Sequence, residues 1–424
     1  MSKQNSTSET LNNLAPQAIG SGHEGNLRDQ ISAYISRLKN GEMGALPAIG
    51  ALIVIGALFA IQSPFFLTKL NIANLFVQAA ELTTLAVALV FVILLAEIDL
   101  SAGVTAGVAM DIFYLSLKAG LPWVPAFIIS LLFGALVGWV LGFFVAKIGV
   151  PSFVVTLAFF LGFQGLALVL LGDGGLFRVD VPEVKAIMNN NLPEWGGWAM
   201  VIVMVLVSLG MGLWDRKRRA DQGLATRPIS LLISKVALLA VLGSLVVWVL
   251  NLNRSATMIH PIIGVPIVIP IVIGIIFVGT FVLDRTRFGR HLYAVGGNPE
   301  AARRAGIKVG MIRIAAFMIT STLAVVSGLL HVSRIGVVEA SAGRTIVLNG
   351  VAAAVVGGVS LFGGRGRLVH AAVGAMVLAI IDNGLGLLGL SAGISFIVTG
   401  SVLALAATID ALSRKRSGGS ILRS

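Results

Sequence analysis

Apolar residues along this chain gather into long, continuous runs that short polar loops separate. Continuous rather than alternating runs indicate helices, and about 20 apolar residues suffice to cross a bilayer core. In lipid, only helices and closed barrels satisfy their own backbone hydrogen bonds. The pattern predicts an all-α, polytopic membrane protein with about 10 to 12 transmembrane helices. The predicted spans are 45–61, 72–96, 101–118, 122–146, 152–172, 195–214, 230–250, 262–283, 311–332, 346–362, 368–390 and 392–412.

Polar segments flank this transmembrane domain of residues 45–412. Residues 1–44 contain no apolar signal-peptide core, so we expect an uncleaved cytoplasmic tail there. Residues 413–424 form a second predicted cytoplasmic tail.

Basic residues distribute unevenly between the two sides of this layout. With the N-terminus inside, 24 of the 31 lysines and arginines fall on the cytoplasmic side. Basic residues in short loops are retained inside, so this split predicts the orientation and explains the net charge of +12 without nucleic acid. The seven outside are Lys69, Lys118, Arg178, Lys185, Arg254, Arg334 and Arg344.

Composition removes several classes of function. The chain is 57% hydrophobic and 12% charged, with a mean hydropathy of +0.95. It has no cysteine, and its five histidines lack metal-ligand spacing, so no metal site is predicted. No GxxxxGK[ST] loop or Ser/His/Asp set occurs, so neither ATP binding nor catalysis is expected in this chain.

A short polar helix is predicted at residues 298–306, between two apolar runs. Asn298 can cap it, Pro299 suits the first position and Gly306 can end it. Glu300 lies at the positive end of the helix dipole, and Arg303 and Arg304 lie in the last turn. Ala301 completes the first turn. So short a helix is marginal alone, so it either rests on its own protein or presents itself to another.

Polar side chains at membrane depth are costly unless they are paired or face a cavity. They either join helices or line a path for a sugar-sized polyol, whose hydroxyls need hydrogen-bond partners. Asp99 and Ser101 are not included in this set of residues, because they can cap the following helix. The candidates for a path are Gln78, Glu81, Asp111, Gln164, Asn349, Asp382 and Asn383.

Glycines predict two packing features. Gly134, Gly138 and Gly142 form consecutive GxxxG steps, which let a neighbouring helix approach closely. The glycines of 357–366 interrupt a span and indicate a broken or re-entrant helix at the cytoplasmic side.

Two pairs of segments suggest an internal repeat. GALVG at 134–138 followed by SFVVT at 152–156 resembles GAMVL at 374–378 followed by SFIVT at 395–399. In the predicted layout the pairs run in opposite directions, as in the inverted repeats of transporters. Chance similarity between apolar segments is the alternative.

Five motifs in order resemble the membrane permease subunits of bacterial monosaccharide ABC importers, the ribose, xylose and galactose permease group. The similarity extends from about residue 65 to 412. The motifs are AEIDLSAG at 96–103, KIGVPSFVVTLAF at 147–159, FGRHLYAVGGNPEAARRAGIKV at 288–309, GVAAAVVGGVSLFGGRGR at 350–367 and DNGLGLLGL at 382–390.

The resemblance implies an ABC importer permease fold in the bacterial inner membrane, surrounded by lipid. It implies three partners: a second permease copy, a cytoplasmic ABC ATPase that supplies ATP and Mg²⁺, and a periplasmic sugar-binding protein. Residues 298–306 would then be the coupling helix that fits the ATPase. No cofactor is expected in this chain itself.

This sequence also differs from the family pattern in places. Asn349 stands where many relatives have an acidic residue before the AAAVVGG stretch. Two additional spans around WDRKRRADQG at 214–223 look like the xylose type, which favours a pentose as cargo. The main alternative is a secondary sugar transporter coupled to protons or sodium, with Glu81, Asp111 or Asp382 as relay.

Overall fold

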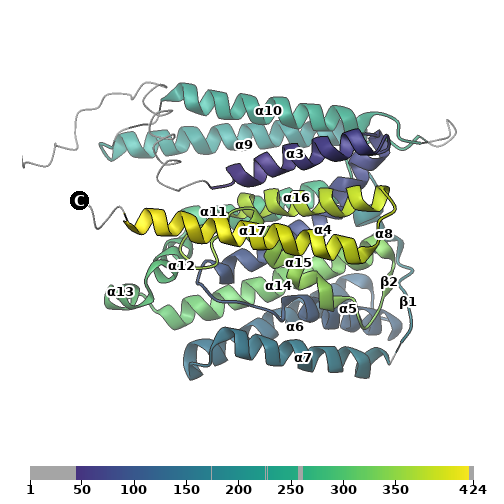
Figure 1. Ribbon diagram of the computed structural model, residues 1–424, viewed down its shortest axis with the longest axis horizontal. Helices are drawn as coiled ribbons and strands as arrows, with labels where there is room; N and C mark the ends of the chain where they lie inside the picture. The colour runs from purple at the N-terminus through teal and green to yellow at the C-terminus, as the bar shows by residue number, and fades with distance from the viewer. Residues whose placement is uncertain (1–43, 173, 225, 227, 256–260, 420–424) are drawn as a thin grey trace, which may run out of the picture. The chain divides into compact units, whose positions relative to one another are not determined.

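The computed structural model describes residues 44–419 except 173, 225, 227 and 256–260, and it is almost entirely helical (Figure 1). Most of the predicted N-terminal tail lies outside the described residues. Nine helices within the described part are long and apolar enough to cross a membrane, and α3 and residues 346–356 are shorter apolar helices. The all-α membrane prediction is confirmed. The main helices, in chain order, are α3 (Leu46–Gln62), α4 (Lys69–Ile93), α5 (Ala102–Lys118), α6 (Trp123–Phe143), α7 (Ser152–Leu171), α9 (Glu194–Asp221), α10 (Ile229–Asn251), α11 (Val268–Arg285), α14 (Val309–Ile335), α15 (Gly343–Val356), α16 (Leu368–Leu387) and α17 (Ala392–Gly419).

Short elements connect these helices. A π-helical turn, η1 (Phe144–Ile148), follows α6. The strands β1 (Phe177–Arg178) and β2 (Val337–Val338) pair antiparallel, and α8 (Pro182–Asn189) lies between α7 and α9. Two short helices, α12 (Arg287–Gly297) and α13 (Pro299–Arg304), join α11 to α14. The sequence predicted α13 but not α8, α12 or the strand pair.

Residues 198–248, most of α9 and α10, form a compact unit of their own. In this hairpin Gly212 packs on the Leu232 side chain, and Gly243 packs on Val201. The helix α9 runs to Asp221, beyond the predicted end at 214, so most of the basic stretch at 214–223 is helical rather than a loop.

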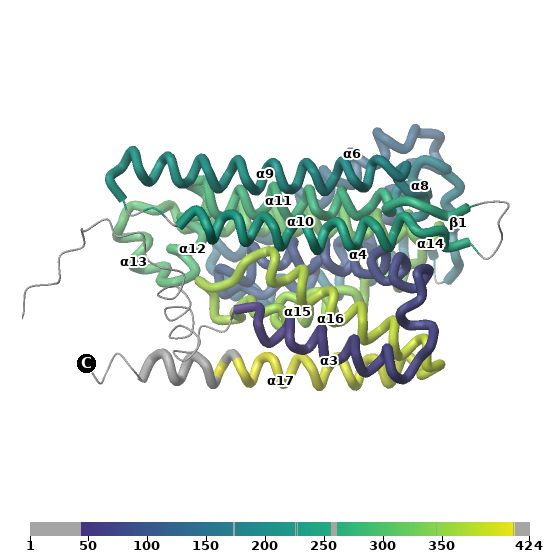
Figure 2. The backbone as a smooth tube through the Cα atoms, turned by 90° about the horizontal axis from the view of Figure 1, so that it is seen from above, coloured from purple at the N-terminus to yellow at the C-terminus, as the bar shows by residue number. Residues whose placement is uncertain are grey.

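The other unit is built around α4 and α14 (Figures 1 and 2). The helix α14 packs on α4, α5 and α6, while α4 packs on α14, α15 and α16. A continuous stretch of α4 from Ala79 to Ala88 is buried apart from Leu82. These two helices therefore form the centre of the unit.

The packing of this unit repeats with inverted direction. The helix α5 packs on α6, α7 and α14, and α15 packs in the same way on α16, α17 and α4. The first residues of α4 and α14, Lys69 and Val309, are 240 residues apart, as are Gly134 and Gly374 in the matching segments. This arrangement supports the inverted repeat over chance similarity.

The turns that follow α4 and α14 contain a closer sequence repeat than the predicted one, and it was not predicted from the sequence. The sequence DLSAG at 99–103 corresponds to EASAG at 339–343, again 240 residues apart. Ala96 (φ 59°) and Gly336 (φ 75°) both adopt the left-handed conformation, and Ala96 is the one non-glycine residue to do so in the described part. Each turn thus has the same backbone reversal before an acidic residue and Ser-Ala-Gly.

The helices α5 and α15 begin beside one another instead of at opposite membrane surfaces. A Cβ placed on Gly103 would lie 2.6 Å from the carbonyl oxygen of Gly343, and one on Gly107 would lie 3.4 Å from the Gly343 Cα. The part of α5 beyond Gly107 extends about 16 Å, at the usual rise per residue. The start of α15 is therefore well inside the bundle.

The glycines of α6 lie against α14, as their spacing predicted. A Cβ on Gly134 would lie 2.6 Å from a Val325 methyl carbon, and one on Gly142 would lie 2.6 Å from the Ile314 Cα. A Cβ on Gly138 would overlap the Phe317 carbonyl oxygen. The prediction of close helix packing is confirmed.

Three further predicted boundaries were wrong. The span at 346–362 ends at Val356, because Gly358, Gly363, Gly364 and Gly366 have positive φ and turn the chain back. This reversal agrees with the predicted broken helix. The span at 262–283 begins only at Val268, because Arg254 donates to the Gly264 carbonyl (3.0 Å) and holds that segment as a loop. The last helix, α17, continues past the predicted end at 412.

Candidate functional site

The short helix α13 has the geometry that its sequence predicted. The Asn298 side chain accepts a hydrogen bond from the Ala301 N–H (2.9 Å), Pro299 occupies the first turn, and Gly306 has φ 82°. Glu300 forms ion pairs with both Arg303 and Arg304, at 3.2 Å each. These capping and charge interactions stabilise a helix that would be marginal alone.

The helix α13 presents most of its surface to solvent. The predicted coupling residues are all exposed, and the side chains of Arg303 and Arg304 are 67% and 81% exposed. Only Ala302 is buried, at 4%, in the main apolar core. One side chain therefore anchors the helix to its own chain, and its charged face is free for a partner.

The helix α12 fixes α13 against two turns from distant parts of the chain. Leu292 and Val295 of α12 are fully buried. Gly296 packs on the Leu94 carbonyl so closely that a Cβ would overlap it. The same carbonyl accepts a hydrogen bond from the Gly364 N–H (2.8 Å). The end of α4, the end of α12 and the glycine turn at 357–367 therefore meet at one carbonyl group.

A tyrosine adds a second connection between α12 and the glycine turn. The Tyr293 hydroxyl donates to the Gly366 carbonyl (2.8 Å). Burial, together with the nearby negative charge of Asp284, raises the pKa of Tyr293 to about 12. The hydroxyl therefore stays protonated and remains a donor at physiological pH. Arg367, the last residue of this turn, lies 3.9 Å from Asp284 at the end of α11.

The turn between α4 and α5 connects to α7. Asp99 accepts hydrogen bonds from the Ser101 N–H (2.9 Å) and hydroxyl (2.7 Å), whereas Ser101, the N-cap residue of α5, forms no side-chain capping hydrogen bond. The Ser152 hydroxyl accepts from the Ile98 N–H, and the Thr156 hydroxyl donates to the Ile98 carbonyl, both at 3.2 Å. Ile98 is thus held on both backbone groups by the first turns of α7.

Four of the five sequence motifs meet at this end of the bundle, which we call the α13 end (Figure 2). They are the turn at 96–103, the start of α7, the α12–α13 segment and the glycine turn. The ion pair of Glu97 with Arg313 of α14 (3.0 Å) closes the ring of contacts. A displacement of α13 would therefore reach α4, α5, α7 and α14 through short, stiff connections.

Some of the polar side chains predicted at membrane depth come together. Asn383 exchanges two hydrogen bonds with Asn71, at 2.8 and 2.9 Å, and donates to Gln78 (3.3 Å). Sequence reading missed Asn71, which lies in the first turn of α4. This amide network joins α4 to α16, so its members connect helices in this structure.

Glu81 also connects helices. Its two carboxylate oxygens lie 2.8 Å from the His331 ring and 3.1 Å from the Arg334 guanidinium, both on α14. The Glu81 backbone carbonyl accepts from Ser327 (2.9 Å). These contacts support the interpretation that Glu81 joins helices rather than lining a path.

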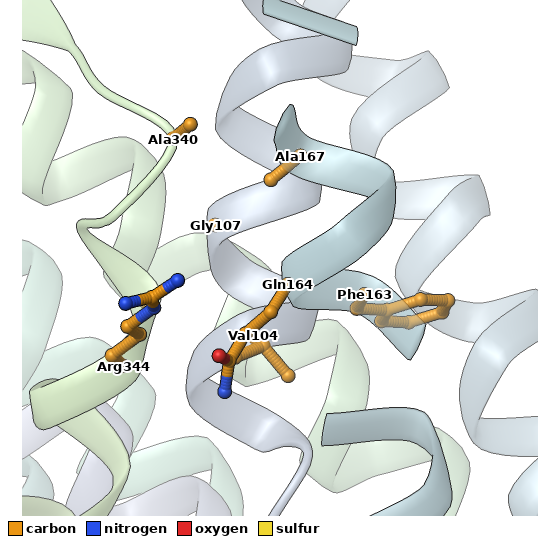
Figure 3. Close-up of a pocket in the computed structure, with 8 residues that line it drawn as sticks. Val104, Gly107, Phe163, Gln164, Ala167, Ala340 and Arg344 are labelled. Carbon is orange, nitrogen blue, oxygen red and sulfur yellow. The ribbon is translucent and has the colours of Figure 1, made fainter. Parts of the chain in front are cut away.

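The remaining candidates are spread over the unit. Asp111 is fully buried on α5, and neither carboxylate oxygen has a hydrogen-bond partner among the described residues. Asn349 is half-buried on α15, and Asp382 is exposed on α16 with a hydrogen bond to Ser395. Gln164 lies at a small pocket together with Arg344 (Figure 3).

The chain matches one protein family over residues 71–407, described as the permease component of the branched-chain amino acid transport system. It is 34% identical to the xylose transport system permease protein XylH of Escherichia coli strain K12, over 83% of this chain and 87% of that protein. It is 33% identical to XylH of Haemophilus influenzae, over 83% and 91%. It is 31% identical to the ribose import permease protein RbsC of Escherichia coli strain K12, over 82% and 88%. No solved structure matches the chain.

Proposed function

The chain belongs to this family of transport permease components, and from that premise we propose that it is the membrane-spanning subunit of an ATP-driven sugar importer. The observation that carries the proposal is α13, a capped and exposed helix at the junction of four family motifs. It would act as the coupling helix, with ATP and Mg²⁺ bound by a separate ATPase. Closure of the ATPase would move α13, and the connections through Gly296, Leu94 and Gly364 would pass the movement to the helices.

The α13 end would face the cytoplasm, as would both termini. This placement follows from the excess of basic residues in the loops on that side. Arg344 is an exception to the predicted loop assignment, because it lies in the first turn of α15, next to the Gly343 that packs on Gly103. When Arg344 is no longer counted among the outside loops, the difference in the number of basic loop residues between the two sides increases.

The opposite end carries a small polar cap suited to a soluble partner. Asp180 forms ion pairs with Lys185 of α8 and Arg178 of β1, and the side chains of Arg178 and Asp180 are 77% and 67% exposed. The charged side chain of Lys185 holds the pKa of Asp180 below its usual value, so the carboxylate is charged at neutral pH. A periplasmic sugar-binding protein would dock on this cap.

A pentose is the preferred cargo. The two xylose permeases named above match this chain at higher identity than the ribose permease does, and the additional hairpin α9–α10 is present. A second copy of the chain would complete the transport path, with lipid covering the remaining apolar surfaces.

ATP dependence is the direct test of this function. We expect the chain, reconstituted in vesicles with its ATPase and sugar-binding protein, to accumulate pentose when ATP is supplied. Uptake should stop when the ATPase carries an inactive catalytic glutamate, and it should survive a protonophore at constant ATP. Uptake that the protonophore abolishes would instead favour the ion-coupled carrier, with Asp111 or Asp382 as the relay.

Charge reversal on α13 tests the docking surface. We expect R303E/R304E to lower co-purification of the ATPase at least about tenfold, since it breaks two pairs with Glu300 and inverts an exposed charged face. The matched control is R218E/R219E, which reverses two consecutive exposed arginines in the last turn of α9. Equal co-purification of the two double variants would contradict a docking role for α13.

A further inference from the structure

A small pocket lies where the two inverted repeats meet. Its walls come from the first turns of α5 (Val104 and Gly107), from α7 (Phe163, Gln164 and Ala167), from the start of α15 (Gly343 and Arg344) and from Ala340 in the turn before α15. In the repeat, Val104 and Arg344 occupy equivalent positions, 240 residues apart. The pocket therefore lies beside the point where the first turns of α5 and α15 pack against each other.

Two polar side chains reach into this pocket from opposite walls. Figure 3 shows the Arg344 guanidinium and the Gln164 amide pointing toward the same gap, one from α15 and one from α7. Within the described part of the chain, no ion pair or hydrogen bond is formed by either side chain. The Arg344 side chain is exposed at the mouth of this pocket, and an arginine at membrane depth generally faces a cavity or pathway. A permanent charge and an amide without partners thus face one gap.

The size of the gap limits what can enter it. In this conformation the narrow part has room for about one water molecule, and the Arg344 side of the pocket is open. A sugar ring does not fit between the walls, but a single hydroxyl group does. The apolar surfaces of Val104, Ala167 and Ala340 surround the two polar groups, so a hydroxyl that enters finds few other partners.

We propose that Arg344 and Gln164 form a hydroxyl-binding station for the sugar on its way through the permease. The Arg344 guanidinium donates to a sugar hydroxyl oxygen, and the Gln164 amide oxygen accepts the hydroxyl proton. The ring remains at the open mouth of the pocket. This proposal rests on the proposed transport function and adds to it two contact residues on different helices. One of them, Arg344, comes from the interrupted helix α15 that contacts its repeat mate α5.

The chain has no cysteine, so a single introduced thiol can report on the pocket. In the full reconstituted importer, we expect A340C to react with a small methanethiosulfonate reagent more slowly when pentose and ATP are both present than with ATP alone. The control is G165C, next to Gln164 but on an exposed position with open space around it. Its labelling should not respond to sugar.

Substitution of the two polar side chains supplies the functional readout. We expect Q164A and R344A each to lower uptake at limiting pentose about tenfold, the ratio for one lost hydrogen bond of about 1.4 kcal/mol. ATP hydrolysis stimulated by the binding protein should be retained. R344K should recover part of the uptake, because lysine keeps a charged donor. R219A, on an exposed turn of α9, is the control for removal of an arginine.

The outcomes distinguish a failure of the proposed pocket from a failure of the proposed transport function. Sugar-independent labelling of A340C while the same complex transports pentose would overturn the station. Normal uptake by both Q164A and R344A would also overturn it. If the wild-type complex transports no sugar, the proposed function itself fails, and the sugar assignment of the pocket fails with it.

Discussion

Gly296→Ala is expected to uncouple ATP hydrolysis from transport. The added methyl group would overlap the Leu94 carbonyl oxygen, and a Cβ there would also lie 2.9 Å from the Gly364 N. Neither contact is with a flexible side chain, so the three segments must separate. Overpacking of this kind costs about 1–3 kcal/mol, and here the cost falls on the junction that joins α12 to α4 and the glycine turn. We expect uptake to fall more than about tenfold while the ATPase remains bound to α13, which does not include this position.

The neighbouring glycine provides a matched control. A Cβ on Gly297 would meet nothing within 4 Å, although the two residues are consecutive in the last turn of α12. We therefore expect G297A to transport normally. The measurement is the ratio of pentose imported to ATP hydrolysed in vesicles. A G296A variant with the wild-type ratio would show that the junction is not part of the transmission.

Gly138→Ala is expected to destabilise the permease itself. Its methyl group would overlap the Phe317 carbonyl oxygen and lie 2.6 Å from the Met318 Cα, so α6 and α14 must move apart. The separation would loosen the stripe that also includes Gly134 and Gly142. Alanine normally stabilises a helix by up to about 1 kcal/mol over glycine, so a net loss would isolate the cost of separating the helices. We expect a lower melting temperature and less folded protein after extraction in mild detergent.

The control for this variant is Gly162→Ala on α7. Gly162 is exposed, and a Cβ there would meet nothing within 4 Å. G162A should therefore melt at or slightly above the wild-type temperature, because only the helix propensity changes. If G138A and G162A have the same melting temperature, the close approach of the helices at Gly138 does not limit stability.

The sequence predicted features that depend on local chemistry. The helical spans follow from continuous apolar runs, and α13 follows from Asn298, Pro299 and Gly306 at their expected positions. The contact of α6 with another helix followed from the spacing of three glycines. The identity of the partner, α14, did not follow, because a glycine stripe states how close a neighbour comes and not which helix it is.

Features made by distant contacts were missed. Asn71 joins Asn383 across most of the chain, and nothing in its own neighbourhood marks it as part of a network. Arg344 was predicted to lie in a loop, because the sequence alone does not show that α15 begins beside Gly103. The repeated acid-x-Ser-Ala-Gly turn was available in the sequence and would have been found by comparing the chain with itself at a fixed separation of 240 residues.

The compact hairpin of α9 and α10 lies in the chain between the two inverted repeats, and each repeat pairs with the other through its own helices. The segment that joins the halves can therefore change length without altering the register between them. Such a segment is a permissive place for an inserted cassette during evolution. It is also the natural site at which to attach a fluorescent reporter to a working transporter.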